Sequence, residues 1–378
     1  MNKGPIKTCF VIILILVSVL SIAQIQGCSD KGPIKVGFVA GLTGRHYNLG
    51  ISGRDGVMLA IEEINRAGGV NGHSLELITK DDKQEPDAAK RAVRELLSEN
   101  VVAIIGHMTS SMQKETLPII NESDIVMISP TVSSSYFEGR DDNFIMLHPS
   151  TKVSGKIFSD YAYKAMGLKK ITAVYDLSNR TYTESWVNNF RDSFLLSEDT
   201  IFNSIAFTSG EQRSFLDLAK QALKQEPDAI VVVANALDTA IISQQVRKIS
   251  NKVKIMSAEW AFTGDILEQG GSAVEGVVFI QKVNLLSDSP RFASFSKIYE
   301  ERYGNPPDFA SFLAYEAMKS VLFEALKITR YKSEIKGAIL NIRKFKGLDS
   351  DFEIDGNGDV LREHYIFTIR GNKFVGIR

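Results

Sequence analysis

The sequence predicts an α/β protein of two Rossmann-like lobes, joined by a hinge of crossing segments, with a ligand cleft between them. Short apolar runs alternate with amphipathic helical stretches, first over residues 34–130 and again after residue 150. This alternation is typical of parallel strands covered by helices on both faces. The chain has 378 residues, which is more than one ordinary core accommodates, and no low-complexity linker separates the two series. We therefore expect two lobes.

The first series predicts strands and helices in strict alternation. Its strands are the apolar runs at residues 34–40, 75–82, 101–106 and 124–130. Between the first two runs, apolar side chains from Val57 to Ile64 recur at helical spacing. Between the next two, Ala89, Val93 and Leu96 lie on one face of a second predicted helix. A third helix follows residue 106 and ends near residue 119.

The second series repeats this pattern and then changes. Its predicted strands are "KITAVYD", "DAIVVVAN", "VKIMSAE" and "GVVFIQ". Helices are expected over residues 290–326 and 333–345, and the alternating segments 352–360 and 364–377 predict antiparallel pairing. The expected boundaries are residues 29–149 with 284–346 for the first lobe, and residues 150–283 with 347–378 for the second.

Residues 1–28 predict a signal peptide. Lys3 and Lys7 precede an apolar stretch at residues 10–20, which is too short to span a bilayer comfortably. Gly27 and Cys28 follow it as in a bacterial lipobox, which predicts lipidation of Cys28. We expect an exported protein, periplasmic or at the cell surface, with a lipid anchor in the membrane; a plain transmembrane anchor is the alternative.

Cysteine use and charge exclude several classes of function. Cys9 lies in the predicted signal peptide, so the mature chain would hold Cys28 alone, with no internal disulfide and no cysteine-based metal site or thiol catalysis. The net charge is -1. Positive and negative residues are interspersed without a basic stripe, so we expect no nucleic-acid partner.

Polar side chains follow the predicted strands where each strand ends. The candidates are Met108, Thr109, Ser110, Ser111, Thr131, Ser133, Ser134, Tyr182, Asn235, Glu259 and Trp260. In open α/β sheets, ligands bind outside the carboxyl ends of the strands. Hydroxyls and helix N-termini suit a carboxylate, and an acid on the opposite lobe suits an ammonium group. A small zwitterion would fit this set, although a single serine after a strand is more often a helix cap.

Five blocks of the sequence resemble the type I periplasmic solute-binding proteins, in the branch that binds leucine, isoleucine and valine. They are "IKVGFVAGLTG", "AIEEINRAGGVNG", "IIGHMTSS", "VMISPTVSS" and "IMSAEWA", in the order typical of that family. The likeness covers nearly all of the chain after residue 28. It implies a protein that captures a small ligand by lobe closure and delivers it to an ABC-type permease.

The resemblance also implies roles for individual residues. Ser110, Thr131 and Ser133 match the positions that bind the ligand carboxylate, and Glu259 matches the acid that binds the ammonium group. Tyr182 and Asn235 match contact positions in the second lobe, and Met108 and Trp260 flank the matched residues.

The ligand implied by the resemblance is an amino acid or a related carboxylate. Leu49 stands where the family often has an aromatic residue, and Thr131 replaces a small apolar one. These differences therefore leave open which ligand binds: branched and aromatic amino acids, aromatic acids and amides are all compatible. The protein is expected to act as a monomer without a cofactor. A ligand-sensing module for a membrane receptor or kinase is the alternative, because it would have the same fold.

A serine hydrolase using Ser111 and Lys114 is a remote alternative. Ser-x-x-Lys is the acylating pair of penicillin-recognising enzymes, but their Ser-Asp-Asn and Lys-Thr-Gly elements are absent from the sequence. Lys114 is better explained as part of a solvated helix face.

The segment "DFEIDGNGD" resembles a calcium loop. Arg362 stands at the twelfth position, where a glutamate is needed, so a hairpin turn is the better explanation. The five histidines show no metal-binding spacing, and we expect no metal site.

Overall fold

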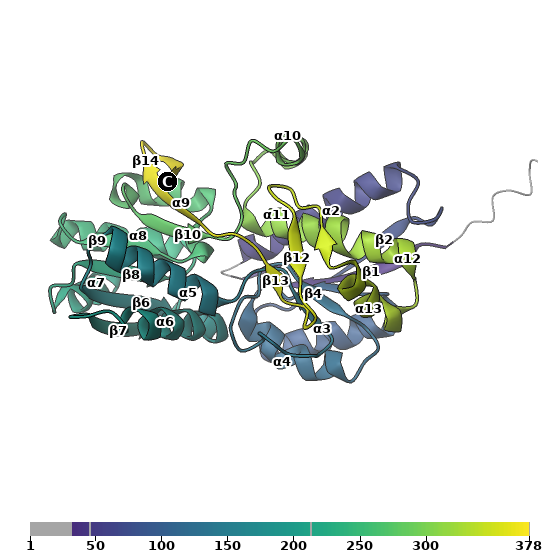
Figure 1. Cartoon of the computed structure of the whole chain (residues 1–378), viewed down its shortest axis with the longest axis horizontal. Coiled ribbons are helices and arrows are strands. Elements are labelled where there is room, and N and C mark those ends of the chain that lie inside the picture. Colours follow the sequence, from purple (N-terminus) through teal and green to yellow (C-terminus); the bar gives the residue numbers. More distant parts are fainter. Residues whose placement is uncertain (1–31, 45–46, 212–213, 378) are drawn as a thin grey trace, which may run out of the picture.

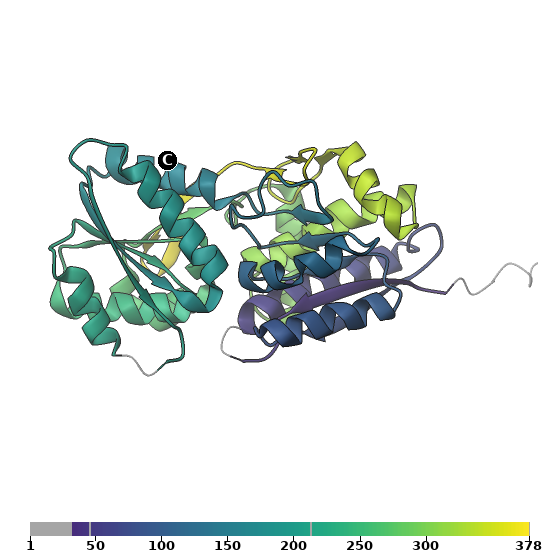
Figure 2. The ribbon, with the colours of Figure 1, turned by 90° about the horizontal axis from the view of Figure 1, so that it is seen from below.

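Two α/β lobes lie side by side in the computed structural model, which describes residues 32–44, 47–211 and 214–377 (Figure 1). Residues 1–28 and the predicted lipidation site at Cys28 lie outside the described residues. Helices cover both faces of the main sheet in each lobe (Figure 2). The predicted fold class is confirmed.

Lobe 1 is built on a parallel five-stranded sheet with the order β2-β1-β3-β4-β5. Its strands are β1 (Ile34–Ala40), β2 (Leu75–Asp81), β3 (Ile104–Gly106), β4 (Met127–Ser129) and β5 (Phe144–Met146). The register of the first pair runs from Ile34 opposite Leu75 to Ala40 opposite Asp81. The central strands are buried on both faces, which explains their continuous apolar runs. Strand β5 was missing from the sequence-based prediction.

The helices of lobe 1 come from two separate parts of the chain. They are α2 (Tyr47–Arg66), α3 (Pro86–Ser98), α4 (Ser110–Asn121), α10 (Pro290–Tyr303), α11 (Phe309–Glu316), the π-helical η5 (Ala317–Leu322), α12 (Phe323–Ile328) and α13 (Lys332–Ile342). Helix α2 packs closely on α11, because a Cβ atom at Gly56 would lie 2.2 Å from the Ser311 carbonyl oxygen. Only glycine allows this approach. Helix α3 begins at Pro86. Proline lacks a backbone N–H, but in the first turn of a helix this group would have no intrahelical acceptor, so proline is well suited to this position.

Lobe 2 is built on a seven-stranded sheet with the order β15-β14-β10-β9-β8-β6-β7. Its strands are β6 (Lys170–Asp176), β7 (Ile201–Phe207), β8 (Ala229–Val233), β9 (Lys254–Ser257), β10 (Val278–Gln281), β14 (Tyr365–Arg370) and β15 (Lys373–Ile377). Strands β14 and β15 both lie within segment 364–377 and form an antiparallel hairpin, which pairs antiparallel to β10, whereas the other pairs are parallel. The expected pairing of this segment with residues 352–360 is wrong, because those residues belong to a separate sheet.

Helices and short turns complete lobe 2. The helices are α5 (Thr151–Asp160), α6 (Arg180–Phe194), α7 (Phe215–Leu223), α8 (Ala236–Ile249) and α9 (Gly264–Gly270). The short turns are the π-helical η1 (Tyr161–Ala165) and the 3-10 helices η2 (Leu177–Asn179), η3 (Glu259–Ala261) and η4 (Gly271–Val274). Trp186 and Phe190 of α6 are fully buried and stack with ring centroids 5.3 Å apart, which fixes α6 on the sheet.

A small three-stranded sheet lies against lobe 1 beside β5. It consists of β11 (Lys344–Phe345), β12 (Phe352–Ile354) and β13 (Val360–Leu361). The Met146 N–H donates to the Gly358 carbonyl oxygen over 2.9 Å, and Phe352 packs on Phe345, which follows α13 closely. Residues 347–361 were assigned to the second lobe from the sequence. The contacts above hold this hairpin on lobe 1, so the assignment of these residues is wrong. The chain crosses to lobe 2 only after Leu361.

Three buried charged residues meet where the chain crosses between the lobes, and we call Glu316, Asp349 and Arg362 the hinge cluster. Arg362 forms an ion pair with Glu316 and lies 4.0 Å from Asp349. Asp349 also accepts the N–H of Asn284 over 2.7 Å. Burial raises the pKa of Glu316 to about 7, against the opposing effect of the Arg362 charge. The cluster links the crossings at residues 284 and 362 to helix α11.

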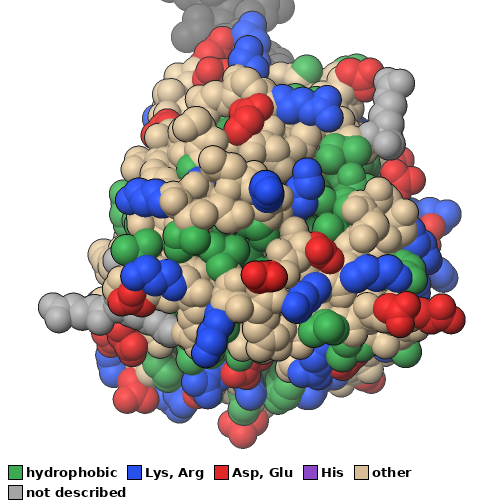
Figure 3. Space-filling view, turned by 90° about the vertical axis from the view of Figure 1, so that its left-hand side faces the viewer, with side chains coloured by type: hydrophobic (Ala, Val, Ile, Leu, Met, Phe, Trp, Pro, Cys, Tyr) green, Lys and Arg blue, Asp and Glu red, His purple; other side chains and the backbone are tan. Residues whose placement is uncertain are grey.

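Charged side chains of both signs are interspersed on the end face of lobe 2 (Figure 3). This mixed surface agrees with the charge distribution seen in the sequence. Within the residues that the structure describes, no helix is long and apolar enough to cross a membrane.

Candidate ligand-binding site

An internal cavity lies between the two lobes. It is lined by Leu49, Met108, Ser110, Thr131, Ser133, His148, Asn179, Tyr182, Glu259, Trp260 and Phe309. Several of these residues directly follow a strand, so the cavity lies at the carboxyl ends of both sheets. Its volume is about 20 Å³, room for about one water molecule, so side chains fill most of the space between the lobes in this conformation.

The lobe 1 wall carries hydroxyl groups. Ser110 is buried at the start of α4, where backbone N–H groups lack intrahelical acceptors and the helix dipole favours an anion. The Thr131 hydroxyl donates to the Met108 carbonyl oxygen over 2.6 Å. The buried Ser133 hydroxyl has no protein partner among the described residues. This wall offers hydrogen-bond donors and no acid, as a carboxylate requires.

The lobe 2 wall carries an acid between aromatic side chains. Glu259 follows β9 directly and is 2% exposed. Its Oε2 accepts the indole N–H of Trp186 over 3.2 Å. Tyr182 packs edge-on against Trp260, with ring centroids 6.0 Å apart. Burial, with the nearby Glu259 charge, raises the pKa of Tyr182 well above its usual value, so this phenol stays protonated.

His148 is a lining residue that the sequence analysis missed. Its Nδ1 lies 3.1 Å from the Nζ of Lys282. A lysine ammonium only donates hydrogen bonds, so Nδ1 accepts and the imidazole proton is on Nε2. Burial and the positive charge of Lys282 lower the pKa of His148 well below its usual value, so the ring is neutral. His148 Nε2 is a buried donor without a protein partner among the described residues.

The structure brings most of the predicted site residues together. Those lining the cavity are Met108, Ser110, Thr131, Ser133, Tyr182, Glu259 and Trp260. Asn235 does not line it: its Oδ1 accepts the N–H of Asp238 over 3.0 Å, so it caps helix α8. Asn179 and Phe309 line the cavity although the sequence analysis did not single them out.

Neutral hydrogen bonds join the lobes beside the cavity, and we call Ser111, Asn179 and Thr181 the latch. The Ser111 N–H donates to Asn179 Oδ1 over 3.1 Å, and the Ser111 hydroxyl accepts the Thr181 N–H over 3.2 Å. The Nζ of Lys114 lies over the Tyr136 ring, 5.0 Å from its centroid. Ser111 thus serves as a contact between the lobes, and Lys114 is occupied elsewhere.

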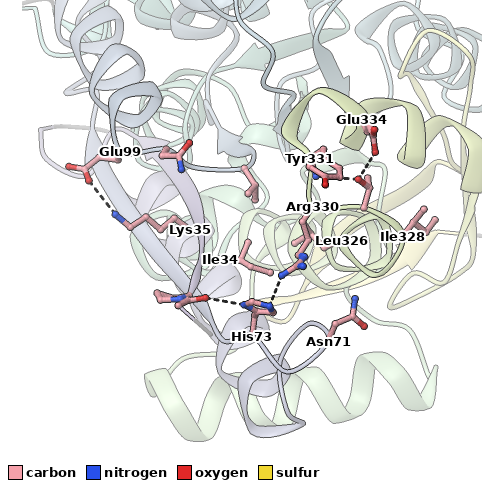
Figure 4. A pocket seen from close by; sticks show the side chains of 15 residues that line it. Ile34, Lys35, Asn71, His73, Glu99, Leu326, Ile328, Arg330, Tyr331 and Glu334 are labelled. Atoms are coloured by element: carbon pink, nitrogen blue, oxygen red, sulfur yellow. Dashed lines mark hydrogen bonds and ion pairs between the residues drawn. The ribbon is translucent and has the colours of Figure 1, made fainter. Parts of the chain in front are cut away.

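A larger, open groove lies at the amino ends of the lobe 1 strands, beside the start of β1 (Figure 4). Lys35 forms an ion pair with Glu99 at 3.7 Å, and Arg330 donates a hydrogen bond to His73 Nε2 over 2.5 Å. The groove is remote from the carboxyl ends of the strands, so we place the ligand in the internal cavity. Among the described residues, no group of three or more His, Cys, Asp or Glu side chains is arranged to hold a metal ion.

Comparisons with known proteins agree with this architecture. A leucine-specific-binding protein of Salmonella typhimurium is 22% identical over 337 residues, which is 89% of each chain. A branched-chain amino-acid transporter substrate-binding protein from Streptococcus pneumoniae, solved with isoleucine, has a TM-score of 0.82 at 22% identity. The match covers 91% of this chain and all of that one.

An ABC-transporter solute-binding protein from R. palustris, solved with benzoate, is also similar. Its TM-score is 0.82 at 20% identity, and the match covers 92% of this chain and 96% of that one. The family model described as "Periplasmic binding protein" matches residues 33–359. Because this match spans most of the chain, the chain belongs to the periplasmic binding protein family.

Proposed function

We propose that this protein is an extracytoplasmic solute-binding protein that captures a small carboxylate-bearing ligand, an amino acid, by lobe closure and delivers it to an ABC transporter. In this role it performs no reaction and needs no cofactor. It acts as a monomer, exported to the periplasm or the cell surface and held at the membrane by a lipid on Cys28.

One observation carries the proposal: two buried polar atoms at the cavity lack protein partners among the described residues. They are Ser133 Oγ and His148 Nε2, each on a residue that lines the cavity. A buried donor or acceptor without a partner costs about 1–3 kcal/mol. A ligand that supplied these hydrogen bonds would recover that free energy and hold the lobes together.

The arrangement supports a ligand with one charged end and an apolar body. The carboxylate would lie against Ser110 and Ser133, and the ammonium group against Glu259. Leu49, Met108 and Phe309 leave an apolar surface for the side chain. The leucine-specific relative and the isoleucine complex support an aliphatic amino acid, whereas the benzoate complex supports an acid without an ammonium group.

A thermal-shift screen tests the proposal. The panel contains aliphatic and aromatic amino acids, the same acids without the amino group, and short amides. A ligand that binds the folded protein at 100 times its Kd stabilises it by about 2.7 kcal/mol. We expect at least one amino acid to raise Tm and to bind by calorimetry. A panel without any shift would refute capture of these ligand classes.

Loss of the latch is expected to weaken binding modestly. Asn179→Ala removes one neutral hydrogen bond between the lobes, worth about 0.5–1.5 kcal/mol. The dissociation constant should therefore rise roughly 2- to 12-fold, with most of the change in the dissociation rate, because the closed state is destabilised. Stopped-flow tryptophan fluorescence measures this. Asn203→Ala, at an exposed bond to Gln225 in lobe 2, is the control and should leave the rate unchanged.

A further inference from the structure

The Glu259 carboxylate is paired with a cation that the sequence analysis did not single out. Lys282 directly follows β10, and its Nζ lies 2.7 Å from Glu259 Oε1. The two side chains are buried, at 0% and 2% exposed. Both residues belong to lobe 2, so the ion pair forms without closure of the cleft.

The pairing changes what Glu259 offers to a ligand. Lys282 donates to one carboxylate oxygen and Trp186 to the other. An ionised carboxylate accepts about four hydrogen bonds, so Glu259 can still accept from a ligand. Its negative charge, however, is already neutralised. A ligand ammonium group would be attracted by Glu259 and repelled by Lys282, which contacts the same carboxylate.

Lys282 also acts on the other wall of the cavity. By donating to His148 Nδ1, it keeps the imidazole proton on Nε2, where none of the described residues supplies an acceptor. The Nε2–H is therefore available to an acceptor atom such as a carboxylate oxygen. Lys282 thus neutralises the Glu259 carboxylate, which would suit an ammonium group. It also orients the His148 Nε2–H, which would suit a carboxylate.

We propose that Lys282 is a specificity-determining positioning residue, which lowers the preference of the site for an amino acid over the matching acid without an ammonium group. This inference rests on the proposed function, since it concerns the same cavity. With Lys282 present, a simple carboxylate enters a site in which Glu259 is neutralised. Without Lys282, that ligand would meet an uncompensated Glu259, whereas an amino acid would bring its own cation.

The wild-type protein provides the first test. The probes are the amino acid with the largest Tm rise in the screen and the same acid without its amino group, for example leucine and 4-methylpentanoate. We expect the two dissociation constants, measured by calorimetry, to differ by less than about 30-fold. A larger preference for the amino acid overturns the inference and leaves the proposed function standing.

Substitution of Lys282 provides the second test. Lys282→Met is expected to raise the preference for the amino acid at least tenfold, chiefly by weakening the simple acid. Glu259→Gln/Lys282→Met, without either charge, should return the ratio to near its wild-type value. Lys220→Met, at an exposed lysine of lobe 2, is the control. An unchanged ratio in a folded Lys282→Met variant overturns the inference.

Two further outcomes bear on both this inference and the proposed function. If only acids without an ammonium group bind, the amino-acid assignment fails and the role of Lys282 is supported. If neither class binds, the proposed ligand class fails and this inference fails with it. Should Lys282→Met not fold, the wild-type ratio alone decides.

Discussion

Glu259→Ala is expected to abolish amino-acid binding, with a loss of affinity of at least about 100-fold, or roughly 2.7 kcal/mol. The ligand ammonium group would face Lys282 without the carboxylate that lies between the two charges. The same change leaves Lys282 as a buried, unpaired cation, which typically costs about 3–5 kcal/mol of folding stability. Calorimetry with the amino acid identified in the thermal screen, together with urea unfolding, measures both effects.

A matched control separates the effect of losing the site residue from the effect of removing any negative charge from lobe 2. Glu268 is an exposed acid on α9, and Glu268→Ala should leave both affinity and stability within error of the wild type. If Glu259→Ala binds the amino acid as tightly as the wild type does, the zwitterion site is wrong. If affinity is lost without loss of stability, the burial argument for Lys282 is wrong.

Arg362→Met is expected to destabilise the protein by about 3–5 kcal/mol, because it leaves Glu316 and Asp349 buried without their cation. Methionine keeps an apolar stem of similar length, although the guanidinium that lies over the Phe352 ring, 3.9 Å from its centroid, is lost. The loss is therefore due chiefly to charge. Urea unfolding at pH 7 measures it, and Arg343→Met, at an exposed partner of Glu353, is the control.

The pH dependence of this variant follows from the pKa of Glu316. Burial raises this pKa to about 7 in the folded protein, whereas the ordinary value is 4.5. Without Arg362 the folded state would hold its proton more tightly still. Between about pH 5 and pH 8 the folded state then binds more protons than the unfolded state, so the stability of the variant falls as pH rises. An equal loss at pH 6 and pH 8 would contradict this account.

The sequence was sufficient for the sheets because buried parallel strands leave a clear local signal. The runs at residues 34–40 and 170–176 are apolar, and each is followed by a helical stretch. Both form interior strands of their sheets. Strand β5 has only three residues, Phe144–Met146, after a polar segment. Strands β3 and β4 are equally short and were predicted, but no helix precedes β5, so the alternation of strands and helices did not indicate it. His148, which follows its carboxyl end, was missed with it.

Tertiary contacts explain the remaining differences. Lys282 follows an apolar strand, where a lysine usually marks the surface, and its partner Glu259 lies 23 residues earlier. No local pattern reports that pairing. Asn235 also follows a strand, but an amide at that place serves equally well as a helix cap, and the structure has it in that role. Ser110 and Ser133 were found because strand ends of one sheet converge on one edge.

The latch has a consequence for how long a captured ligand stays in the cleft. Ser111, Asn179 and Thr181 join the lobes through uncharged donors and acceptors. Dissolved salt screens interactions between exposed charges, but it has little effect on hydrogen bonds between neutral groups. The residence time set by these contacts should therefore be nearly the same in dilute and in concentrated salt. Such a protein would hold its ligand equally long while the ionic strength of the surrounding solution changes.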